Sequence, residues 1–527
     1  MVAALRGPDG KQWLAALHKE VRSHAKHNTL GPKLSQAPPG FITVPFAALP
    51  QVKRNGIKKA RGVMRGYLMM QGQHFNETFA PVPIVDTIRL LLAIATAKDW
   101  QIKQGDINTA FLCSEMDHKV YARVPDWFDE ATTLENIPTT TSIREVLKGI
   151  PGMPQCSRLF NNKAKATFKA LGLSQSKADP ALFFNTQLSI YLVAWVDDLF
   201  LFFPTSSTES ATTLWKNLQA AFDLGPWDDI NDCLGCVVHR DRERRCMHIE
   251  QSKAISALAD RSGLSQSKPM TTPMTPGLKL TKEDCPQATQ ERIALTGEQK
   301  WYRSAVASCI YFSTWTRPDI AYAVSRLCRY MHNPGKQHIV ALKHLIRYLA
   351  ATPTLGLFYK DLGGKKEKVF GYYDAAHADC PDTMRSTLGD IFYYGNYSPI
   401  GWSSKVHSFV TTSSNHSEYC AAAKTTRRAM ALHYLCDEIG FNDLIKPIAL
   451  FSDSKGAIAM AYNPVAKTKC KHVDLADHYT REKVESGATT ISYVPTGEMR
   501  ADAMTKPLGH TLFLKHRPFL VGDSHGN

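Results

Sequence analysis

One stretch constrains the fold of this chain more than any other: residues 190–203, which read IYLVAWVDDLFLFF. Twelve of these residues are apolar, many of them β-branched or aromatic, and the two exceptions, Asp197 and Asp198, stand together in the middle. An apolar run with such a break predicts a strand, a tight turn at Asp197-Asp198 and a second strand. The turn lacks the glycine that short hairpin turns favour.

Two adjacent carboxylates on so apolar a background have two interpretations. They repel each other and resist burial, so a divalent cation would stabilise the pair. Alternatively, they are ordinary charged residues at the solvent-exposed tip of a hairpin. The stretch by itself leaves both interpretations open.

The charge of the chain favours a polyanionic partner. There are 63 Lys and Arg residues against 48 Asp and Glu, a net charge of +15, which favours nucleic acid first and an anionic membrane second. No apolar run is long enough to span a bilayer and the N-terminus lacks a signal-peptide core, so we expect a cytosolic or nuclear protein. The only CxxC, Cys233 and Cys236, has no second pair nearby, and reduced thiols are expected rather than a zinc site.

The 527 residues have room for two to four domains. The clearest boundary is the Pro/Thr/Lys-rich segment 268–286, and a second boundary falls at 360–368. An αβ block is predicted before the first boundary, a helical block between the two, and strands followed by an αβα order after the second, as in an RNase H-like mixed sheet. The main expected helices are 84–100, 209–222, 298–352 (broken at Arg317-Pro318), 418–440 and 455–462. Strands are expected at 369–373, around 390–402, at 448–451 and at 489–494, and residues 101–112 are expected to be a strand that runs into a helix.

Carboxylates recur at the ends of the predicted strands. Asp106 lies on a strand that can face the Asp197-Asp198 hairpin. In the last block, Asp374 and Asp453 end strands, Glu418 opens a helix and Asp502 lies at the last helix, although each alone is better explained as a surface acid or a helix cap. Converging carboxylates are what two-metal phosphoryl transfer requires, because they hold two ions about 3.5–4 Å apart.

Several motifs in order resemble the reverse transcriptase plus RNase H portion of a copia-type LTR retrotransposon Pol polyprotein. The resemblance runs from Trp13 to Phe513. It rests on Glu77 to Val82 (ETFAPV), Gln104-Gly-Asp106…Ala110-Phe111-Leu112, Val196-Asp-Asp198, Thr316-Arg-Pro-Asp-Ile320, Tyr348-Leu-Ala-Ala-Thr352, Trp402-Ser-Ser-Lys405, Ser413-Ser…Glu418-Tyr419, Lys471-His472 and Ala501-Asp502…Thr505-Lys506-Pro-Leu508.

The resemblance implies an α+β right-hand polymerase with fingers, palm and thumb, joined through a helical connection to an α/β RNase H-like domain with a mixed five-stranded sheet. The implied boundaries are 1–267 for the reverse transcriptase, 268–365 for the linker and helical connection, 366–510 for the RNase H-like domain and 511–527 for a C-terminal tail. The implied cofactors are two Mg²⁺ or Mn²⁺ ions per active site. The implied partners are an RNA template, a DNA primer, RNA–DNA hybrid, deoxynucleoside triphosphates and the other Pol products, with no membrane; the implied location is a cytoplasmic virus-like particle or the nucleus.

The resemblance also assigns roles to residues. Asp106 and Asp197 would ligate both polymerase metals and Asp198 would complete that site, while Asp374, Glu418, Asp453 and Asp502 would hold the RNase H metals. Phe111 matches the steric gate against a 2′-hydroxyl, with an ordinary core Phe as the alternative, and His472 would assist product release unless it is structural. The implied substrate contacts are Lys59 and Arg61 to the triphosphate, Gly152 and Gln155 under the nascent base pair, and Trp195 as the platform for the primer end.

The chain departs from the family pattern at several positions. Trp195 replaces a Tyr, Gly62 replaces a Leu, and the loop Pro151-Gly-Met-Pro-Gln-Cys-Ser-Arg158 keeps only the Gly, Gln and Arg of the usual motif. Ala376 and His377 replace an Asp and a Trp of the second site. An active polymerase with RNase H is the first hypothesis, since all seven carboxylates are present; a remnant that only binds nucleic acid, or one that keeps RNase H alone, are the alternatives.

Overall fold

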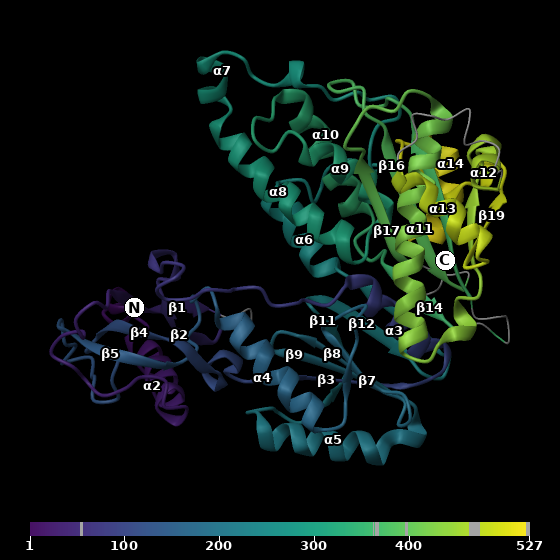
Figure 1. The fold of residues 1–527 in the computed structure, drawn as a ribbon. Coiled ribbons are helices and arrows are strands. Elements are labelled where there is room, and N and C mark those ends of the chain that lie inside the picture. The colour runs from purple at the N-terminus through teal and green to yellow at the C-terminus, as the bar shows by residue number, and fades with distance from the viewer. Residues whose placement is uncertain (53–55, 362, 364–367, 396–398, 463–474, 523–527) are drawn as a thin grey trace. The chain divides into compact units, whose positions relative to one another are not determined.

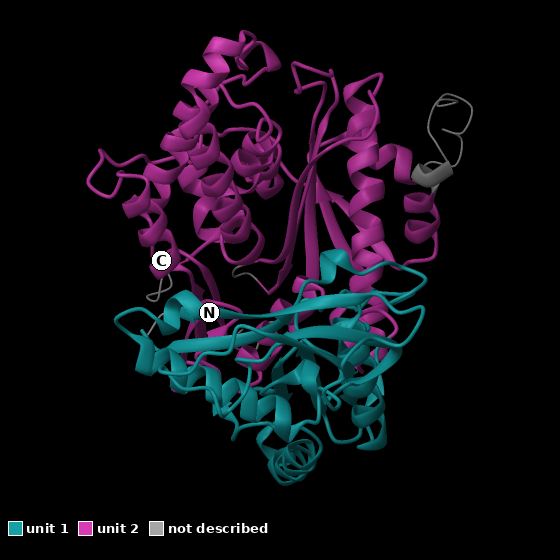
Figure 2. Ribbon diagram, turned by 90° about the vertical axis from the view of Figure 1, so that its left-hand side faces the viewer, with its two compact units in different colours: residues 1–83, 103–176, 180–228 teal, residues 84–102, 177–179, 229–527 magenta. Residues whose placement is uncertain are grey.

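The computed structural model describes residues 1–52, 56–361, 363, 368–395, 399–462 and 475–522 (Figure 1). Contacts divide the chain into two compact units (Figure 2). Unit 1 holds residues 1–83, 103–176 and 180–228, and unit 2 holds residues 84–102, 177–179 and 229–527. These units follow contacts rather than sequence pattern, and the domain boundaries given above stay predictions.

The first part of unit 1 is a four-stranded sheet of order β2-β1-β4-β5. β1 pairs antiparallel with β2 and parallel with β4, and β4 pairs antiparallel with β5. Apolar side chains of α2, including Trp13 and Leu17, form one core with Phe46 and Val120 of the sheet. The elements are α1 (Val2–Leu5), α2 (Gly10–Lys26), β1 (Thr43–Val52), β2 (Lys58–Met64), β4 (Glu115–Pro125) and β5 (Thr141–Lys148).

The second sheet contains the predicted hairpin. Its order is β10-β3-β9-β8-β7-β6, with β8 and β9 paired antiparallel, so the strand–turn–strand prediction for residues 190–203 is confirmed. Leu192, Leu199 and Leu201 on one face of the hairpin and Val193, Phe200 and Phe202 on the other are all buried, which explains why successive positions of both strands are apolar. The elements are β3 (Gln101–Asp106), α4 (Cys156–Ala170), β6 (Ser174–Gln175), β7 (Leu182–Asn185), β8 (Ile190–Trp195), β9 (Asp198–Phe203), α5 (Thr208–Ala221) and β10 (Asp228–Asp229).

Unit 2 begins with α3 (Val85–Ala97), which packs against a four-stranded sheet of order β11-β12-β13-β14. The last strand of this sheet comes from far along the chain, after the helical block. The elements are β11 (Asp232–Cys233), β12 (Cys236–Asp241), β13 (Cys246–Glu250), α6 (Ser252–Arg261), α7 (Thr289–Ala294), α8 (Thr296–Trp315), α9 (Ala321–Cys328), α10 (Lys336–Ala351) and β14 (Leu357–Lys360).

A buried ion pair within the motif at residues 316–320 is hydrogen-bonded to the motif at residues 348–352 in unit 2. Arg317, after α8, is fully buried and donates two hydrogen bonds to the carboxylate of Asp319, at 2.9 and 2.7 Å. It donates two more to Thr352 at the end of α10, one to the carbonyl at 2.8 Å and one to the hydroxyl at 2.9 Å. The Tyr348 hydroxyl donates to the same carboxylate at 2.6 Å. The break at Arg317-Pro318 is therefore a corner that this network holds in place.

The rest of unit 2 is a mixed five-stranded sheet of order β17-β16-β15-β18-β19. β15, β16 and β17 are antiparallel, while β18 runs parallel to β15 and β19 parallel to β18. This confirms the predicted element order and the mixed sheet. The elements are β15 (Val369–Ala376), β16 (Thr387–Tyr394), β17 (Pro399–Val406), α11 (Ser414–Glu438), β18 (Ile448–Ser452), α12 (Lys455–Tyr462), α13 (Leu475–Glu485), β19 (Thr489–Tyr493) and α14 (His510–Leu520).

A second buried charge network ties α11 to this sheet and to α3. Asp390 of β16 is 1% exposed and lies 2.9 Å from the Lys424 ammonium and 2.5 Å from the Arg428 guanidinium of α11. Burial opposes the ionisation of Asp390, but these two cations outweigh it and hold its pKa well below the usual range. Arg428 also donates to both carboxylate oxygens of Asp86 on α3, at 2.8 and 2.9 Å. The network fixes the helix that carries Glu418.

One helix begins earlier than predicted. α11 begins at Ser414 rather than at Glu418, because the Ser413 hydroxyl accepts the His416 amide and caps the helix four residues earlier. None of the helices in the described ranges combines the length and apolar character needed to cross a membrane.

Two candidate carboxylate sites

The first candidate site lies at the tip of the β8–β9 hairpin in unit 1. Trp195 pairs with Asp198 across the hairpin, so the two turn residues are Val196 and Asp197. The predicted turn at Asp197-Asp198 is therefore wrong by one residue, and Asp198 is the first residue of β9. Val196 has a φ of +55°, a conformation that costs a β-branched residue free energy and that turns normally give to glycine. Strain of this kind persists only where the surrounding structure enforces it.

Asp106 lies beside this turn. It is the last residue of β3, which neighbours β9 in the sheet, and the amide of Ile107 donates to the carbonyl of Asp197 at 2.8 Å. Asp106 is exposed, whereas Asp197 and Asp198 are half-buried. The three carboxylates predicted for the polymerase therefore stand at one end of adjacent strands.

Phe111 and Trp195 flank these carboxylates in sequence. Phe111, in the short 3₁₀ helix Ala110–Cys113, is half-buried, contacts Phe160 edge-to-face at 6.5 Å and packs against both cores of unit 1. Trp195 is half-buried at the end of β8. These contacts agree with a packing role for Phe111, and the steric-gate role and the platform role of Trp195 stay predictions.

The predicted triphosphate contacts lie on the outer face of β2. Arg61 is exposed and Lys59 half-buried, while the alternating residues Ala60, Gly62 and Met64 are buried. Both cations therefore stand on the side of the strand opposite the core.

The loop of residues 151–158, predicted to lie under the nascent base pair, packs closely against β2. Gly152 has a φ of +92°, and a Cβ there would lie 2.3 Å from the Met64 carbonyl oxygen. The Met64 amide donates to the Pro151 carbonyl at 2.8 Å. Gln155 is fully buried and donates to the His74 carbonyl at 3.0 Å. Gln155 thus anchors the loop from within, and its contact with a base pair stays a prediction.

The second candidate site gathers carboxylates from the central elements of the five-stranded sheet. Asp374 lies in β15, Asp453 directly follows β18, and Glu418 lies in the second turn of α11. One ligand oxygen from each lies within 4.8 Å of the others, and this is the one group of three or more potential ligands so close together in the described part of the chain. The polymerase carboxylates do not converge to this degree.

Asp502 and its neighbours complete the second site. Asp502 is 1% exposed in the 3₁₀ helix Arg500–Met504, and the Lys506 ammonium lies 2.8 Å from its carboxylate and 3.7 Å from that of Asp374. The Thr505 hydroxyl donates to Asp374. Thr505 and Lys506 stood in a quoted motif but were not predicted as site residues. The signal was present, because a cation four residues after a buried acid on one turn is a natural counter-charge.

Crowding of acids shifts the pKa values at this site. Burial, with the charges of Asp374 and Asp453, raises the pKa of Glu418 to about 9. Burial and the Asp374 charge raise the pKa of Asp502 to about 7, against the opposing effect of Lys506. One oxygen of Glu418 is buried and has no hydrogen-bond partner among the described residues. An all-oxygen, acceptor-only ligand set with an unsatisfied buried oxygen fits a hard divalent cation such as Mg²⁺ or Mn²⁺.

The substituted positions near this site have ordinary partners. Ala376 is the last residue of β15, and a ring nitrogen of His377 lies 3.2 Å from the Thr411 hydroxyl. His472, the predicted product-release residue, lies outside the described residues.

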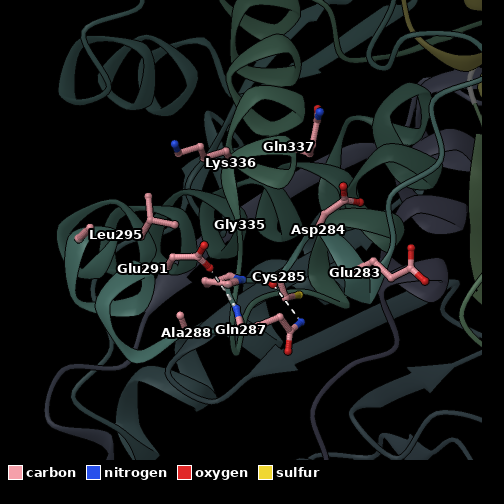
Figure 3. Close-up of a pocket in the computed structure, with 12 residues that line it drawn as sticks. Glu283, Asp284, Cys285, Gln287, Ala288, Glu291, Leu295, Gly335, Lys336 and Gln337 are labelled. Carbon is pink, nitrogen blue, oxygen red and sulfur yellow. Dashed lines mark hydrogen bonds between the residues drawn. The ribbon is translucent and has the colours of Figure 1, made fainter.

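Unit 2 has one cavity beside the second carboxylate site and another cavity whose lining contains none of these carboxylates. One of about 560 Å³ borders the second site and is lined by Ala376, His377, Thr505 and Lys506 among others. Another, of about 500 Å³, lies where Asp284 and Cys285 meet the start of α10 (Figure 3). Its lining contains none of the predicted site residues.

Comparisons with known proteins found similarity to reverse transcriptases and to retrotransposon Pol polyproteins. Residues 46–276 match the family model "Reverse transcriptase (RNA-dependent DNA polymerase)", a range that contains Asp106, Asp197 and Asp198. The chain therefore carries a domain of the reverse transcriptase family. Over most of its length the chain is similar to the Pol polyproteins of copia-type transposons, as the motifs predicted.

The relatives are similar over almost the whole chain. The Retrovirus-related Pol polyprotein from transposon RE1 of Arabidopsis thaliana is 31% identical over 97% of this chain and 34% of its own length. That from transposon TNT 1-94 of Nicotiana tabacum is 29% identical over 97% of this chain and 38% of its own length. The chain thus spans about a third of the length of these curated relatives.

A solved structure shows a weaker similarity. A foamy viral protease-reverse transcriptase in complex with double-stranded DNA aligns with 92% of this chain and 69% of its own, at 13% identity and a TM-score of 0.47. A similarity at this level carries no argument about the function of this chain.

Proposed function

We propose that this chain is an RNA-directed DNA polymerase with a tethered RNase H, which copies retrotransposon RNA into DNA and hydrolyses the RNA strand of the hybrid. The observation that carries the polymerase proposal is the position of Asp106 beside the Val196-Asp197 turn, within a region that belongs to the reverse transcriptase family. The observation that carries the RNase H proposal is the convergence of Asp374, Glu418 and Asp453 on a mixed five-stranded sheet.

In the polymerase site, Asp106, Asp197 and Asp198 would hold two Mg²⁺ or Mn²⁺ ions. The ions supply Lewis acidity and charge neutralisation for in-line transfer of a nucleotide to the primer 3′-hydroxyl. Lys59 and Arg61 donate hydrogen bonds to the triphosphate, and the ring of Phe111 leaves no room for a 2′-hydroxyl. The indole of Trp195 supports the primer end, and the loop of Gly152 and Gln155 lies under the nascent base pair.

In the RNase H site, Asp374, Glu418, Asp453 and Asp502 would hold the cations that activate water against the RNA phosphodiester. Lys506 balances the charge of two of these acids, and Thr505 orients Asp374 through its hydroxyl. The DNA strand and the RNA strand of the hybrid are the proposed partners of this site.

Primer extension tests the polymerase proposal. The purified chain should extend a DNA primer on an RNA template, and Asp197→Asn should reduce the rate by at least about 10³-fold. The variant would lose a carboxylate ligand of the divalent cations that offset the negative charge developing on the phosphoryl group. Asp228→Asn makes the same chemical change at an exposed position and should leave extension unchanged. Equal extension by Asp197→Asn and the wild type would refute the assignment.

An RNase H that has lost its polymerase is the second candidate. It is favoured by one observation: the carboxylates of the second site converge within 4.8 Å in the described structure, whereas those of the first site do not. It predicts hybrid cleavage that Asp453→Asn abolishes, with no nucleotide incorporation in Mg²⁺ or Mn²⁺. Salt-sensitive hybrid binding without either activity would instead identify a remnant that only binds nucleic acid.

A further inference from the structure

The helix α2 lies along β2, the edge strand that carries the predicted triphosphate contacts. β2 pairs only with β1 in the sheet order β2-β1-β4-β5. At its start, the Lys58 ammonium lies 2.8 Å from the Asp9 carboxylate and 5.4 Å from the centre of the Trp13 ring. The helix therefore covers an edge that would otherwise be open to solvent. α2 also lies outside residues 46–276, the range matched by the reverse transcriptase family model.

The closest attachment is a hydrogen bond between Glu20 and the backbone of β2. The Gly62 amide donates to the Glu20 carboxylate at 2.7 Å. This is a charge-assisted bond in a half-buried setting, and such bonds are stronger than neutral ones. Burial opposes the ionisation of Glu20, but nearby His24, the Gly62 amide and the charge of Lys59 outweigh it and hold the pKa of Glu20 below its usual value.

Only glycine allows this approach. A Cβ at position 62 would lie 2.7 Å from the imidazole Nε2 of His24 and 2.7 Å from the ring of Phe46. His24 is itself 4% exposed and fixed by a 2.7 Å contact between its Nδ1 and the Thr29 hydroxyl. The absent side chain at Gly62 is thus the space into which α2 fits.

Gly62 directly follows Arg61, and Lys59 lies three residues before it on the same strand. A strand fixed at its backbone presents its outward side chains at fixed positions, so the Glu20 bond sets where the two cations stand. We propose that Glu20 is a positioning residue that orients Lys59 and Arg61 toward the triphosphate of the incoming deoxynucleotide. This inference rests on the proposed polymerase function.

Steady-state primer extension with the full chain tests the proposal. Glu20→Ala should raise the KM for deoxynucleoside triphosphate roughly 10-fold and change kcat by less than about twofold, because binding is weakened and the reacting groups are untouched. Glu20→Gln keeps an oxygen that can accept the Gly62 amide, so it should recover most of the affinity. Glu209→Ala, at an exposed position of α5, is the matched control and should behave as wild type.

Two further measurements keep the proposal separate from the function on which it rests. Equilibrium binding of the triphosphate to the complex with chain-terminated primer and template needs no turnover, and the variants should rank in the same order. If the wild type and the variants show this ranking of triphosphate affinity but the wild type does not extend primer, the proposed function fails and the positioning role stands. Hydrogen exchange of residues 58–64 should increase in Glu20→Ala. A KM and a triphosphate affinity unchanged in Glu20→Ala would overturn the proposal, as would an equal loss of affinity for primer–template.

Discussion

The buried pair of Arg317 and Asp319 offers the sharpest test of what holds unit 2 together. Both side chains are completely buried, and the guanidinium makes four hydrogen bonds at 2.7–2.9 Å, two to Asp319 and two to Thr352. Arg317→Met removes the cation but leaves the carboxylate of Asp319 in the core, with the Tyr348 hydroxyl as its remaining donor. Breaking a buried pair in this way costs about 3–5 kcal/mol.

The structure supplies a matched control for this cost. Arg244 and Asp241 also form an Arg–Asp pair in unit 2, at 3.7 Å, but their side chains are 73% and 45% exposed. Arg244→Met should therefore cost at most about 1 kcal/mol. In scanning calorimetry, Arg317→Met should lower the Tm of unit 2 by roughly 6–10 °C, and Arg244→Met by no more than roughly 2 °C.

A double variant distinguishes the loss of the Arg317–Asp319 attraction from the cost of leaving the Asp319 carboxylate buried and unpaired. If the cost comes from leaving Asp319 unpaired, Arg317→Met with Asp319→Leu should be more stable than Arg317→Met alone, because no buried charge remains. A double variant less stable than the single one, or an Arg317→Met variant as stable as Arg244→Met, would refute this reasoning.

Three other predictions follow from single groups. Asp390→Asn removes the carboxylate that pairs with the half-buried cations Lys424 and Arg428, although Arg428 keeps Asp86, and should destabilise unit 2 by about 1.5–3 kcal/mol in urea unfolding; a change below about 0.5 kcal/mol would contradict it. Gly152→Ala should destabilise by about 1–3 kcal/mol more than Gly172→Ala, because both have positive φ but only the first meets a backbone oxygen; equal effects would exclude the close approach. Because the folded pKa of Glu20 is below its ordinary value of 4.5, its contribution is present above pH 4.5 and is lost as the pH falls through the folded pKa. The Glu20→Gln variant should show a weaker loss of stability in acid than the wild type, and identical acid profiles would contradict the shift.

The local sequence pattern was sufficient to predict secondary structure wherever a residue's neighbours in sequence decide its conformation. The sequence patterns around Leu192, Leu201 and Asp374 predict their strands. A strand that is buried on one face alternates apolar and polar residues, and a strand that is buried on both faces has a continuous apolar run. Asp374 and Asp453 follow from the same logic, since parallel neighbouring strands bring their ends together. The assignment of these acids to one metal site came from the resemblance to the retrotransposon family, because each acid alone is better explained as a surface acid or a helix cap.

Pairings between distant segments could not be predicted in this way. Arg317 and Tyr348 stood in two quoted motifs, but nothing in either motif shows that the two side chains share the carboxylate of Asp319. The contact of Arg428 with Asp86 joins positions 342 residues apart, so sequence spacing contains no signal for it. Val196 was also missed, because a β-branched residue at positive φ contradicts the local preference that prediction uses.

The difference between the two sites leads to a last prediction about metal binding. The carboxylates of the second site are already held within 4.8 Å by buried strands and by α11, so a cation meets a preorganised set of ligands. Those of the first site stand on an exposed strand end and a strained turn and must still converge, which nucleic acid and triphosphate would assist. Titration of the nucleic-acid-free chain with Mn²⁺, followed by electron paramagnetic resonance, should therefore detect binding that Asp453→Asn removes and Asp197→Asn preserves. Loss of the bound Mn²⁺ in Asp197→Asn to the same extent as in Asp453→Asn would show that preorganisation does not distinguish the sites.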